Sequence, residues 1–429
     1  MARVSRRRRL LGPLAVAVHR AVLRALETLP RRGRTTPAPG PVRFVLAHAW
    51  GMGGTIRTTL TMARHLASSR DVEVISVIRR RDEPFFPFPP GVRVSALEAR
   101  HPILSRLPSL LIHPEDYAYP SCNLQTDLAF VRWLRSLEGG AVVTTRPAFN
   151  LLAARLAPPS VVTIGQEHQH LSIHRPRLAE DIRRHYGRLD ALTVLTTQDE
   201  RDYRDVLAGA RTRVERVPNP VPLTDPPAAD PDATLVVAAG RLNLQKGFDL
   251  LVPAFAAATR DRPDWRLHIY GSGPERARLE QQIDELGAGD RITLMGRSDR
   301  LVDAMAEASV FALSSRWEGF PMVLLEAIAI GLPVVSFDCP TGPRDIVGDG
   351  HGGVLVPAED VDGLAAALGA LIGDPARRRA LAEASRRRAA DFELAAVGAR
   401  VEGLLAQLTA RERAGGPLGS DGLDERVER

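Results

Sequence analysis

The sequence is poor in cysteine, in lysine and in long apolar runs. Cys122 and Cys339 are its two cysteines, far apart in the chain, which excludes a disulfide framework or a cysteine metal cluster and favours a reducing compartment. The apolar run 10–18 is too short to span a bilayer. The body of the chain lacks a basic stripe with interleaved aromatics, which argues against nucleic-acid binding. These deficits predict a cytoplasmic protein that does not bind nucleic acid.

Positive charge is concentrated at the start of the chain. Residues 1–40 hold ten arginines and one glutamate, a net charge of +9, whereas the remaining residues carry −3. Apolar residues recur through this arm at helical spacing: Leu11, Leu14, Val18, Val22, Ala25 and Leu29. A basic amphipathic helix is typical of a segment that lies on an anionic membrane, so residues 1–34 are expected to contact the inner leaflet. A disordered basic tail is an equally good interpretation, whereas basic residues after the apolar run disfavour a signal peptide.

Two domains of ordinary size fit 429 residues. A predicted strand at 42–46, a glycine turn at 51–54, a helix at 55–68 and a strand at 72–77 form a βαβ unit. Six prolines between 218 and 231 mark a stiff connection, after which the βα rhythm restarts. The expected parts are an arm (1–40), a first domain (41–217), a linker (218–232), a second domain (233–391), a helix (392–413) and a disordered tail (414–429).

This organisation predicts an α/β protein with two Rossmann-like domains that face each other across a cleft. Strands are expected at 142–145, 161–164 and 192–195 in the first domain, and at 234–239, 266–270, 292–294, 310–313, 334–337 and 353–356 in the second. Ligands of such sheets bind beyond the carboxyl ends of the strands, so the cleft is the expected site.

The segment Gly240–Gly247 joins a predicted strand to a predicted helix and holds Arg241 and Lys246. Lys246 is the only lysine of the chain, and the other 56 basic residues are arginine. The chain uses arginine at all its other basic positions. The lysine here supplies a compact point charge that arginine does not mimic. Two cations on a βα loop can clamp a diphosphate. The alternative is that one lysine falls here by chance.

The segment 315–326 follows another predicted strand and opens a helix. Residues 318–321 therefore lie at a helix N-terminus, where free N–H groups and the helix dipole favour an anion. On one continuous helix Glu318 and Glu326 would be about 12 Å apart along the axis. A retaining glycosidase needs its carboxyl groups about 5 Å apart, so two carboxylates on different parts of one extended ligand fit better. Taken singly, either glutamate is equally compatible with a surface or loop position without function.

The glycine turn at 51–54 can bring backbone N–H groups to a phosphate from the other domain. It lacks the Gly-Lys-Ser/Thr of a Walker loop, and a plain tight turn is the alternative. Asp-x-Asp pairs occur at 230/232, in the proline-rich linker, and at 360/362, at a predicted helix start. We interpret both as chance or capping, so no metal is expected.

Together these segments resemble the retaining family-4 glycosyltransferases of GT-B fold, over roughly residues 42–391. The similarity is densest in Gly240–Gly247, in Ile269–Glu275 and in Ser314–Pro343. The two glutamates alone are a weak motif. Their context is specific, because the sequence Glu-Gly-Phe-Pro, a helix and Gly-Leu-Pro-Val-Val follow the 240–247 loop by some 70 residues.

The resemblance implies a role for each matching position. The donor diphosphate would be held by Arg241 and Lys246, the donor sugar by Glu318, and the ribose by Glu326. A loosely matching histidine, His168, would lie near the sugar, and a buried or surface histidine without function is the alternative. The family's usual Glu after Gly-Pro is Asp345 here, which leaves its role open. The implied nucleotide-sugar contacts are Gly53, Gly54, Arg241, Lys246, Met295, Gly296, Glu318, Gly319, Phe320, Pro321 and Glu326.

The predicted activity is transfer of a hexose or N-acetylhexosamine from a nucleotide sugar, with UDP as the default, to a glycan, lipid-linked or cell-wall polymer acceptor with retained configuration. No cofactor is expected beyond the donor, and the oligomeric state stays open. A nucleotide-sugar epimerase on the same fold is one alternative. A membrane-associated glycan-binding protein without turnover is another. A pyridoxal-phosphate phosphorylase would need Lys246 as its Schiff-base lysine.

Overall fold

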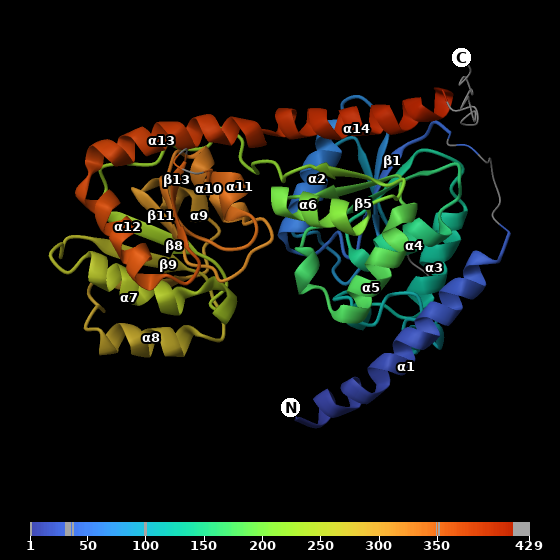
Figure 1. The fold of residues 1–429 in the computed structure, drawn as a ribbon, viewed down its shortest axis with the longest axis horizontal. Coiled ribbons are helices and arrows are strands. Elements are labelled where there is room, and N and C mark those ends of the chain that lie inside the picture. The colour runs from blue at the N-terminus through green and yellow to red at the C-terminus, as the bar shows by residue number, and fades with distance from the viewer. Residues whose placement is uncertain are drawn as a thin grey trace, which may run out of the picture.

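The computed structural model describes residues 2–30, 36, 38–97, 101–348, 350 and 352–414. They form two α/β domains side by side, joined by a linker and by long helices along one edge (Figure 1). The first sheet has seven strands in the order β3-β2-β1-β4-β5-β6-β7, and the second has six in the order β10-β9-β8-β11-β12-β13. All the pairings within both sheets are parallel. This doubly wound order confirms the predicted pair of Rossmann-like domains.

The first domain carries strands buried by helices on both faces. Its strands are β1 (Val42–Leu46), β2 (Val72–Ser76), β3 (Val92–Ala96), β4 (Ala141–Thr144), β5 (Val162–Gln166), β6 (Ala191–Val194) and β7 (Arg213–Arg216). Its α-helices are α2 (Gly54–Leu66), α3 (Leu124–Arg135), α4 (Pro147–Leu156), α5 (Pro176–His185) and α6 (Thr197–Val206). The central strands β4 and β6 are buried along their whole length, as parallel strands between two helical layers must be.

The second domain repeats this layering. Its strands are β8 (Leu235–Ala239), β9 (Arg266–Tyr270), β10 (Ile292–Gly296), β11 (Val310–Leu313), β12 (Val334–Asp338) and β13 (Gly353–Pro357). Its helices are α7 (Phe248–Ala258), α8 (Arg276–Glu285), α9 (Leu301–Ala306), α10 (Met322–Ala329), α11 (Pro343–Val347), α12 (Val361–Gly373) and α13 (Pro375–Ala389). In each domain the strand order reverses in the middle of the sheet, between β1 and β4 and between β8 and β11, where ligands of such folds bind.

The chain ends by returning to the first domain. Helix α14 (Leu394–Ala414) follows α13 along the top of Figure 1 and packs on α2. Val397, Val401 and Leu404 from α14 belong to the apolar core that β1 and β2 also form. The predicted helix at 392–413 is therefore present, and it ties the two domains together. The tail predicted to be disordered lies, from residue 415 on, outside the described residues.

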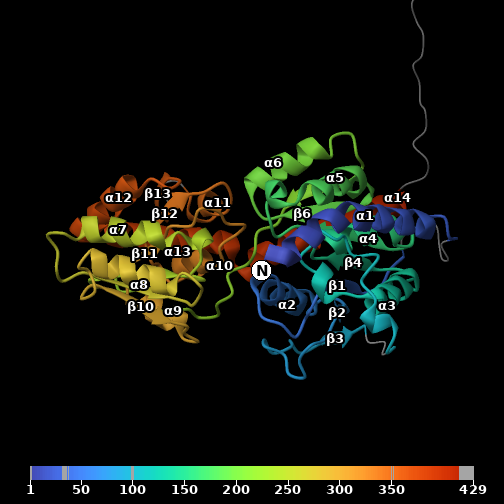
Figure 2. The ribbon, with the colours of Figure 1, turned by 90° about the horizontal axis from the view of Figure 1, so that it is seen from below.

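The arginine-rich arm forms helix α1 (Ala2–Glu27), so a disordered tail is wrong for this segment. The second half of α1 lies along the first domain (Figures 1 and 2). Val16 and Leu23 are buried there, and Arg155 pairs with Glu27 at 2.8 Å. No helix within the described ranges is long and apolar enough to cross a membrane.

Beneath α1 lies a buried polar cluster of His19, His113 and Asp181, whose spacing would suit a metal ion. However, Arg20 already neutralises Asp181 at 2.7 Å. A divalent ion added to two neutral imidazoles and this ion pair would bring a net charge of +2 into a buried site, at high cost. We therefore assign the cluster to the docking of α1.

Two strands were not predicted from the sequence. The proline-rich stretch between residues 84 and 119 contains β3, whose residues are only partly buried at the sheet edge. The other missed strand, β7, has a charged sequence and lies at the opposite edge. An edge strand pairs with only one neighbouring strand and is less buried than a central strand, so its sequence need not be apolar.

Candidate functional site

Two loops meet at the carboxyl edge of the second sheet, where β8 and β11 are neighbours. One loop, 240–247, leads from β8 into α7, and the other, 314–321, leads from β11 into α10. Gly247 has φ +62°, and a Cβ there would lie 2.0 Å from the carbonyl oxygen of Ser314. Only glycine therefore allows the two loops to come this close.

Arg316 fastens the two loops to each other. Its guanidinium donates to the carbonyl of Leu244 at 2.8 Å and to both carboxylate oxygens of Asp249 at 2.8 Å. Its hydrogen bonds lower the pKa of Asp249, so this carboxyl stays ionised. A planar guanidinium makes such a fork, which lysine cannot. Arg316 thus fixes the position of the Lys246 loop relative to the Glu318 loop.

Lys246 and Glu318 lie in direct contact at the junction of the loops. The Lys246 ammonium donates to Oε1 of Glu318 at 2.5 Å, and the Ser315 hydroxyl donates to the same oxygen at 2.6 Å. Both charged side chains are mostly enclosed. Thr341 donates its hydroxyl to the carbonyl of Glu318. The structure therefore brings together the predicted cation and the predicted carboxylate, held in a fixed orientation.

Arg241 lies exposed at the start of the same loop, and within the described part of the chain its guanidinium has no ion pair. The backbone around it is rigid, because a Cβ on Gly271 would lie 1.8 Å from the carbonyl of Gly240. The Leu242 N–H also donates to the backbone carbonyl of Ser272 at 3.0 Å. The Ile269–Glu275 segment thus supports the arginine loop from behind and leaves the guanidinium free for a ligand.

Glu326 lies on α10, the helix that follows the Glu318 loop, and its side chain is buried. Its partner comes from the other domain, since Arg57 Nη1 on α2 donates to its Oε1 at 2.9 Å. Burial raises the pKa of Glu326, and the Arg57 guanidinium opposes that shift. The alternative of a solvent-facing Glu326 is therefore wrong.

The first domain meets these loops along a short front. A Cβ on Gly54 would lie 3.5 Å from the Met322 side chain. Arg297, which follows the predicted base-contacting pair Met295 and Gly296, lies 3.7 Å from the Met52 sulfur in the glycine turn. The structure therefore places the Gly53–Gly54 turn of the first domain opposite α10 and β10 of the second domain.

Residues 319–321 complete the front. A Cβ on Gly319 would lie 2.7 Å from the carbonyl oxygen of His168, so the two domains touch at backbone level here. The Phe320 ring is buried, 6.1 Å from the Phe392 ring, so this residue can offer only its backbone to a ligand. Pro321 caps α10 and packs against Gly342.

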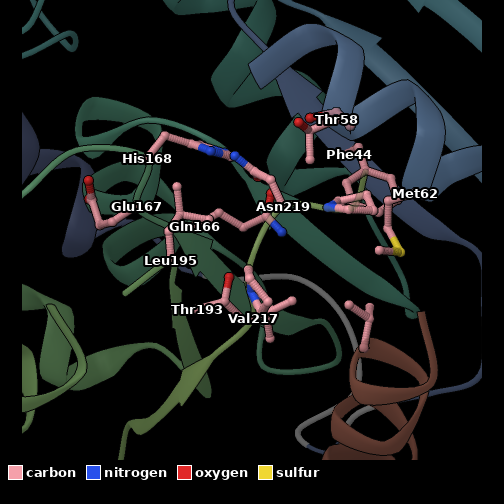
Figure 3. A pocket seen from close by; sticks show the side chains of 14 residues that line it. Phe44, Thr58, Met62, Gln166, Glu167, His168, Thr193, Leu195, Val217 and Asn219 are labelled. Atoms are coloured by element: carbon pink, nitrogen blue, oxygen red, sulfur yellow. The ribbon is translucent and has the colours of Figure 1, made fainter. Parts of the chain in front are cut away.

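His168 lies half-buried at the end of β5. Burial, with a smaller contribution from Arg146, lowers its pKa to about 4, so the ring is neutral at pH 7. Its Nε2 is enclosed and has no partner among the described residues. Figure 3 shows His168 with Gln166, Thr58 and Asn219 around a small pocket that the first domain, the start of the linker and α14 line. One ring nitrogen is therefore left for a ligand or a water.

The Asp-x-Asp pairs have structural roles. Asp360 caps α12 and accepts from the Gly363 N–H at 2.9 Å, and Asp232 pairs with Arg379. Asp345 joins the domains, since its carboxylate accepts from the N–H and the hydroxyl of Thr197 at 2.9 and 2.6 Å. The aspartate at this position therefore holds an interdomain contact.

Sequence reasoning missed Arg57, Arg316 and Ser315. Arg57 lies one helical turn after Gly53, so the helical period places it on the same edge as the glycine turn, which is a usable signal. Arg316 and Ser315 lie within the segment already singled out. Nothing local indicates that the Arg316 side chain joins two loops some 70 residues apart, or that Ser315 donates to Glu318.

Comparisons with known proteins find similar sequences and similar folds. Residues 224–388 match the family described as Glycosyl transferases group 1. An exopolysaccharide phosphotransferase of Streptomyces coelicolor, SCO2592, is 35% identical over 86% of this chain, which spans only 41% of that protein's length. A Campylobacter jejuni alpha-1,4-N-acetyl-D-galactosaminyltransferase, named for an undecaprenol-linked saccharide, is 25% identical. The similarity covers 82% of this chain and 94% of that protein. The structure of Anabaena Alr3699/HepE with UDP-glucose superimposes with a TM-score of 0.66, at 16% identity, over 86% of this chain and 99% of that one.

Proposed function

Because the chain belongs to the glycosyl transferases of group 1 and has the GT-B fold, we propose that it transfers a hexose or N-acetylhexosamine from a UDP-sugar with retention of configuration. The acceptor class we propose is a glycan, a lipid-linked saccharide or a cell-wall polymer. The observation that carries the proposal is the contact between Lys246 and Glu318, beside a free Arg241, at the strand-order reversal of the second sheet.

The proposed site follows the donor from one end to the other. Glu326 binds the ribose hydroxyls, while Arg241 and Lys246 bind the diphosphate. Glu318 accepts hydrogen bonds from the sugar, beside the backbone of residues 319–321. The Gly53–Gly54 turn covers the phosphates from the first domain, and Met295 and Gly296 border the base. These assignments extend the family resemblance to the positions that the structure brings together.

Catalysis in this proposal is mainly electrostatic. The bond between the anomeric carbon and the diphosphate breaks, and the leaving group gains negative charge. The two cations and the N-terminus of α10 stabilise that charge in the transition state, a contribution that is usually the largest in such reactions. The acceptor hydroxyl then attacks from the face that the leaving group vacates, and its proton passes to the departing diphosphate oxygen. The neutral, unpartnered His168 contacts the reacting sugar in this arrangement.

The donor and acceptor classes draw on the relatives. HepE holds UDP-glucose in its structure, and the Campylobacter enzyme acts on an undecaprenol-linked saccharide by its name. The Streptomyces relative is named for an exopolysaccharide, although this chain spans about two fifths of it. These relatives support a UDP-sugar donor and an acceptor from the assembly of a surface polysaccharide.

Helix α1 supports a peripheral position on an anionic membrane. Its outward face carries Leu14 and Val18, whose exposed fractions are 62% and 38%, and Leu29, just beyond the helix, is 48% exposed. Its inward face buries Val16 and Leu23 and makes ion pairs through Arg20 and Glu27. The helix therefore shows apolar side chains to the solvent as well as to the first domain, and a basic sequence precedes them.

A flotation assay tests the membrane contact. We expect the protein to float with vesicles rich in phosphatidylglycerol, and the double variant Leu14→Glu/Val18→Glu to stay at the bottom. Leu286→Glu, an exposed leucine just after the end of α8, is the matched control. Equal flotation of all three proteins would contradict the proposed contact between α1 and the membrane.

The activity itself is tested by incubating the protein with UDP-glucose, UDP-galactose and the UDP-N-acetylhexosamines, with and without a membrane extract as acceptor source. We expect release of UDP together with transfer of labelled sugar to the extract. An isomerised nucleotide sugar without transfer would instead identify an epimerase. Binding of glycan without turnover of any donor would identify a glycan-binding protein.

A further inference from the structure

Arg57 joins three parts of the molecule. It belongs to α2 of the first domain, its Nη1 donates to Glu326 of the second domain at 2.9 Å, and its Nη2 donates to the carbonyl of Pro222 in the linker at 3.1 Å. The glycine turn that precedes α2 already contacts the second domain through Met52 and Gly54. The guanidinium therefore lies where the two domains and their connection converge.

Glu326 depends on this arginine. Its side chain is only 10% exposed, and a buried carboxylate is costly unless a cation pairs with it. Among the charged side chains that the structure describes, Arg57 alone acts on the Glu326 pKa, and it opposes the upward shift caused by burial. The arginine thus favours the ionised form of the carboxylate against the effect of burial.

The contact leaves part of the carboxylate available. Arg57 occupies Oε1, while Oε2 has no hydrogen bond to a described residue and is not among the enclosed, unpartnered atoms. An ionised carboxylate with one oxygen anchored and the other open is a suitable acceptor for a ligand's hydroxyl groups. Arg57 itself keeps 36% of its side chain exposed, so it does not seal the site.

We propose that Arg57 is a positioning residue for the nucleotide, which pairs with Glu326 and orients its carboxylate only when the two domains are in contact. This inference rests on the proposed function, because it takes a nucleoside diphosphate as the ligand of Glu326. It adds that the first domain contributes to nucleotide affinity through a carboxylate of the second. Nucleotide binding and domain contact are then coupled, because each favours the same arrangement.

The opposite role makes the opposite prediction. If Arg57 were a plug that the nucleotide must displace, its removal would free Glu326 and tighten binding. If it only stabilised the fold, its removal would lower the melting temperature and leave affinity unchanged. The sign of the affinity change therefore separates the three roles.

The test is calorimetric titration of the full chain with UDP, and with GDP and ADP in parallel, between pH 6 and pH 8.5. The variants are Arg57→Ala, Arg57→Lys, Glu326→Gln and the double variant Arg57→Ala/Glu326→Gln. Arg64→Ala, an exposed arginine two turns along α2, is the matched control. Arg57→Lys keeps the charge, so it guards against a variant that fails to fold.

We expect Arg57→Ala to raise the Kd about ten-fold or more, which is the scale of a lost hydrogen bond to a charged group. The loss should be larger at pH 6 than at pH 8.5, because the unpaired Glu326 takes up a proton as the pH falls. Arg57→Lys should recover part of the affinity. In the Glu326→Gln background the arginine should matter little, because the carboxylate on which it acts is gone.

Unchanged or tighter binding by Arg57→Ala would overturn the inference and leave the proposed function intact. Equal losses from Arg57→Ala in the wild-type and Glu326→Gln backgrounds would also overturn it. If the wild-type protein bound none of the three nucleotides, the proposed function would fail, and the inference with it.

Discussion

The single lysine of the chain, Lys246, donates a hydrogen bond of 2.5 Å to Oε1 of Glu318, 72 residues further along. Each charge is therefore compensated before any donor binds. An incoming phosphate would compete with the Glu318 carboxylate for the Lys246 ammonium. The sugar hydroxyls would then donate hydrogen bonds to the carboxylate oxygen that the ammonium has left. This pair is the centre of the proposed donor site.

Replacing Lys246 tests the role of that charge. We expect Lys246→Ala to lower kcat/KM for sugar transfer by about 100-fold or more, the scale for loss of one group that stabilises transition-state charge. Lys246→Arg should recover little, because the site is shaped around a compact ammonium. Arg300→Ala, an exposed arginine with a local partner, is the control. Steady-state kinetics on folded variants would refute the role if Lys246→Ala kept wild-type turnover.

Gly319 should not tolerate a side chain. In Gly319→Ala the added methyl would lie 2.7 Å from the carbonyl oxygen of His168, so the domains must move apart at this point. We expect turnover to fall by about ten-fold or more, with little change in thermal stability, because misplacement of about 1 Å already costs much of the rate. Gly403→Ala, whose Cβ meets open space on α14, should stay active. A fully active Gly319→Ala would show that this close approach is not needed.

Arg316 should matter for donor binding through the loops that it joins. Arg316→Lys keeps the charge but loses the two-oxygen contact with Asp249 and the bond to Leu244. We expect a several-fold rise in the KM for the donor and a loss of about 1–3 kcal/mol in the free energy of unfolding. Donor titrations and urea denaturation would measure both. A drop in stability with an unchanged KM would restrict Arg316 to a structural role.

Acidification should weaken the docking of α1 through His19. Burial, with the neighbouring His113, lowers the pKa of His19 from 6.5 to about 4, while Leu110 and Asp181 oppose this shift and Arg155 adds to it. A lowered folded-state pKa means that the stabilisation is complete above pH 6.5 and is lost as the pH falls towards 4. The full difference is about 3 kcal/mol.

The control for His19 is His19→Asn, which retains a donor for the carbonyl of Leu110. We expect urea denaturation between pH 7.5 and 4.5 to show a shallower loss of stability for this variant, by about one proton. His168 and His185 also have lowered pKa values and contribute to the slope of both proteins. Parallel slopes for the two proteins would show that His19 is not buried as a neutral ring.

The second domain was predictable from the sequence almost strand by strand. The predicted strands at 266–270 and 310–313 have the observed bounds. Apolar runs between short glycine and proline turns account for this, because parallel strands are buried on both faces. The edge strands β3 and β7 escaped prediction, since half-buried and charged sequences carry no such signal.

The candidate site was predictable where it consists of loops and not where it consists of contacts. Strand, glycine, cation and helix in sequence indicated the Lys246 loop, and the same logic indicated Glu318 and Glu326. The pairing of Glu326 with Arg57 spans 269 residues and two domains. It depends on how the domains face each other, which no local pattern encodes.

The sequence also left the role of the arm undecided. Helical spacing indicated α1, but not that its Arg20 and Glu27 would pair with Asp181 and Arg155 of the first domain. Buried ion pairs form only after partners from distant segments are in place, so composition alone does not reveal them.

The most direct test of the central claim is a crystal structure of the full chain with UDP bound. The account predicts the diphosphate within hydrogen-bonding distance of the Arg241 guanidinium and the Lys246 ammonium, and the ribose hydroxyls at Oε2 of Glu326. A nucleotide bound elsewhere, remote from these three side chains, would contradict the account.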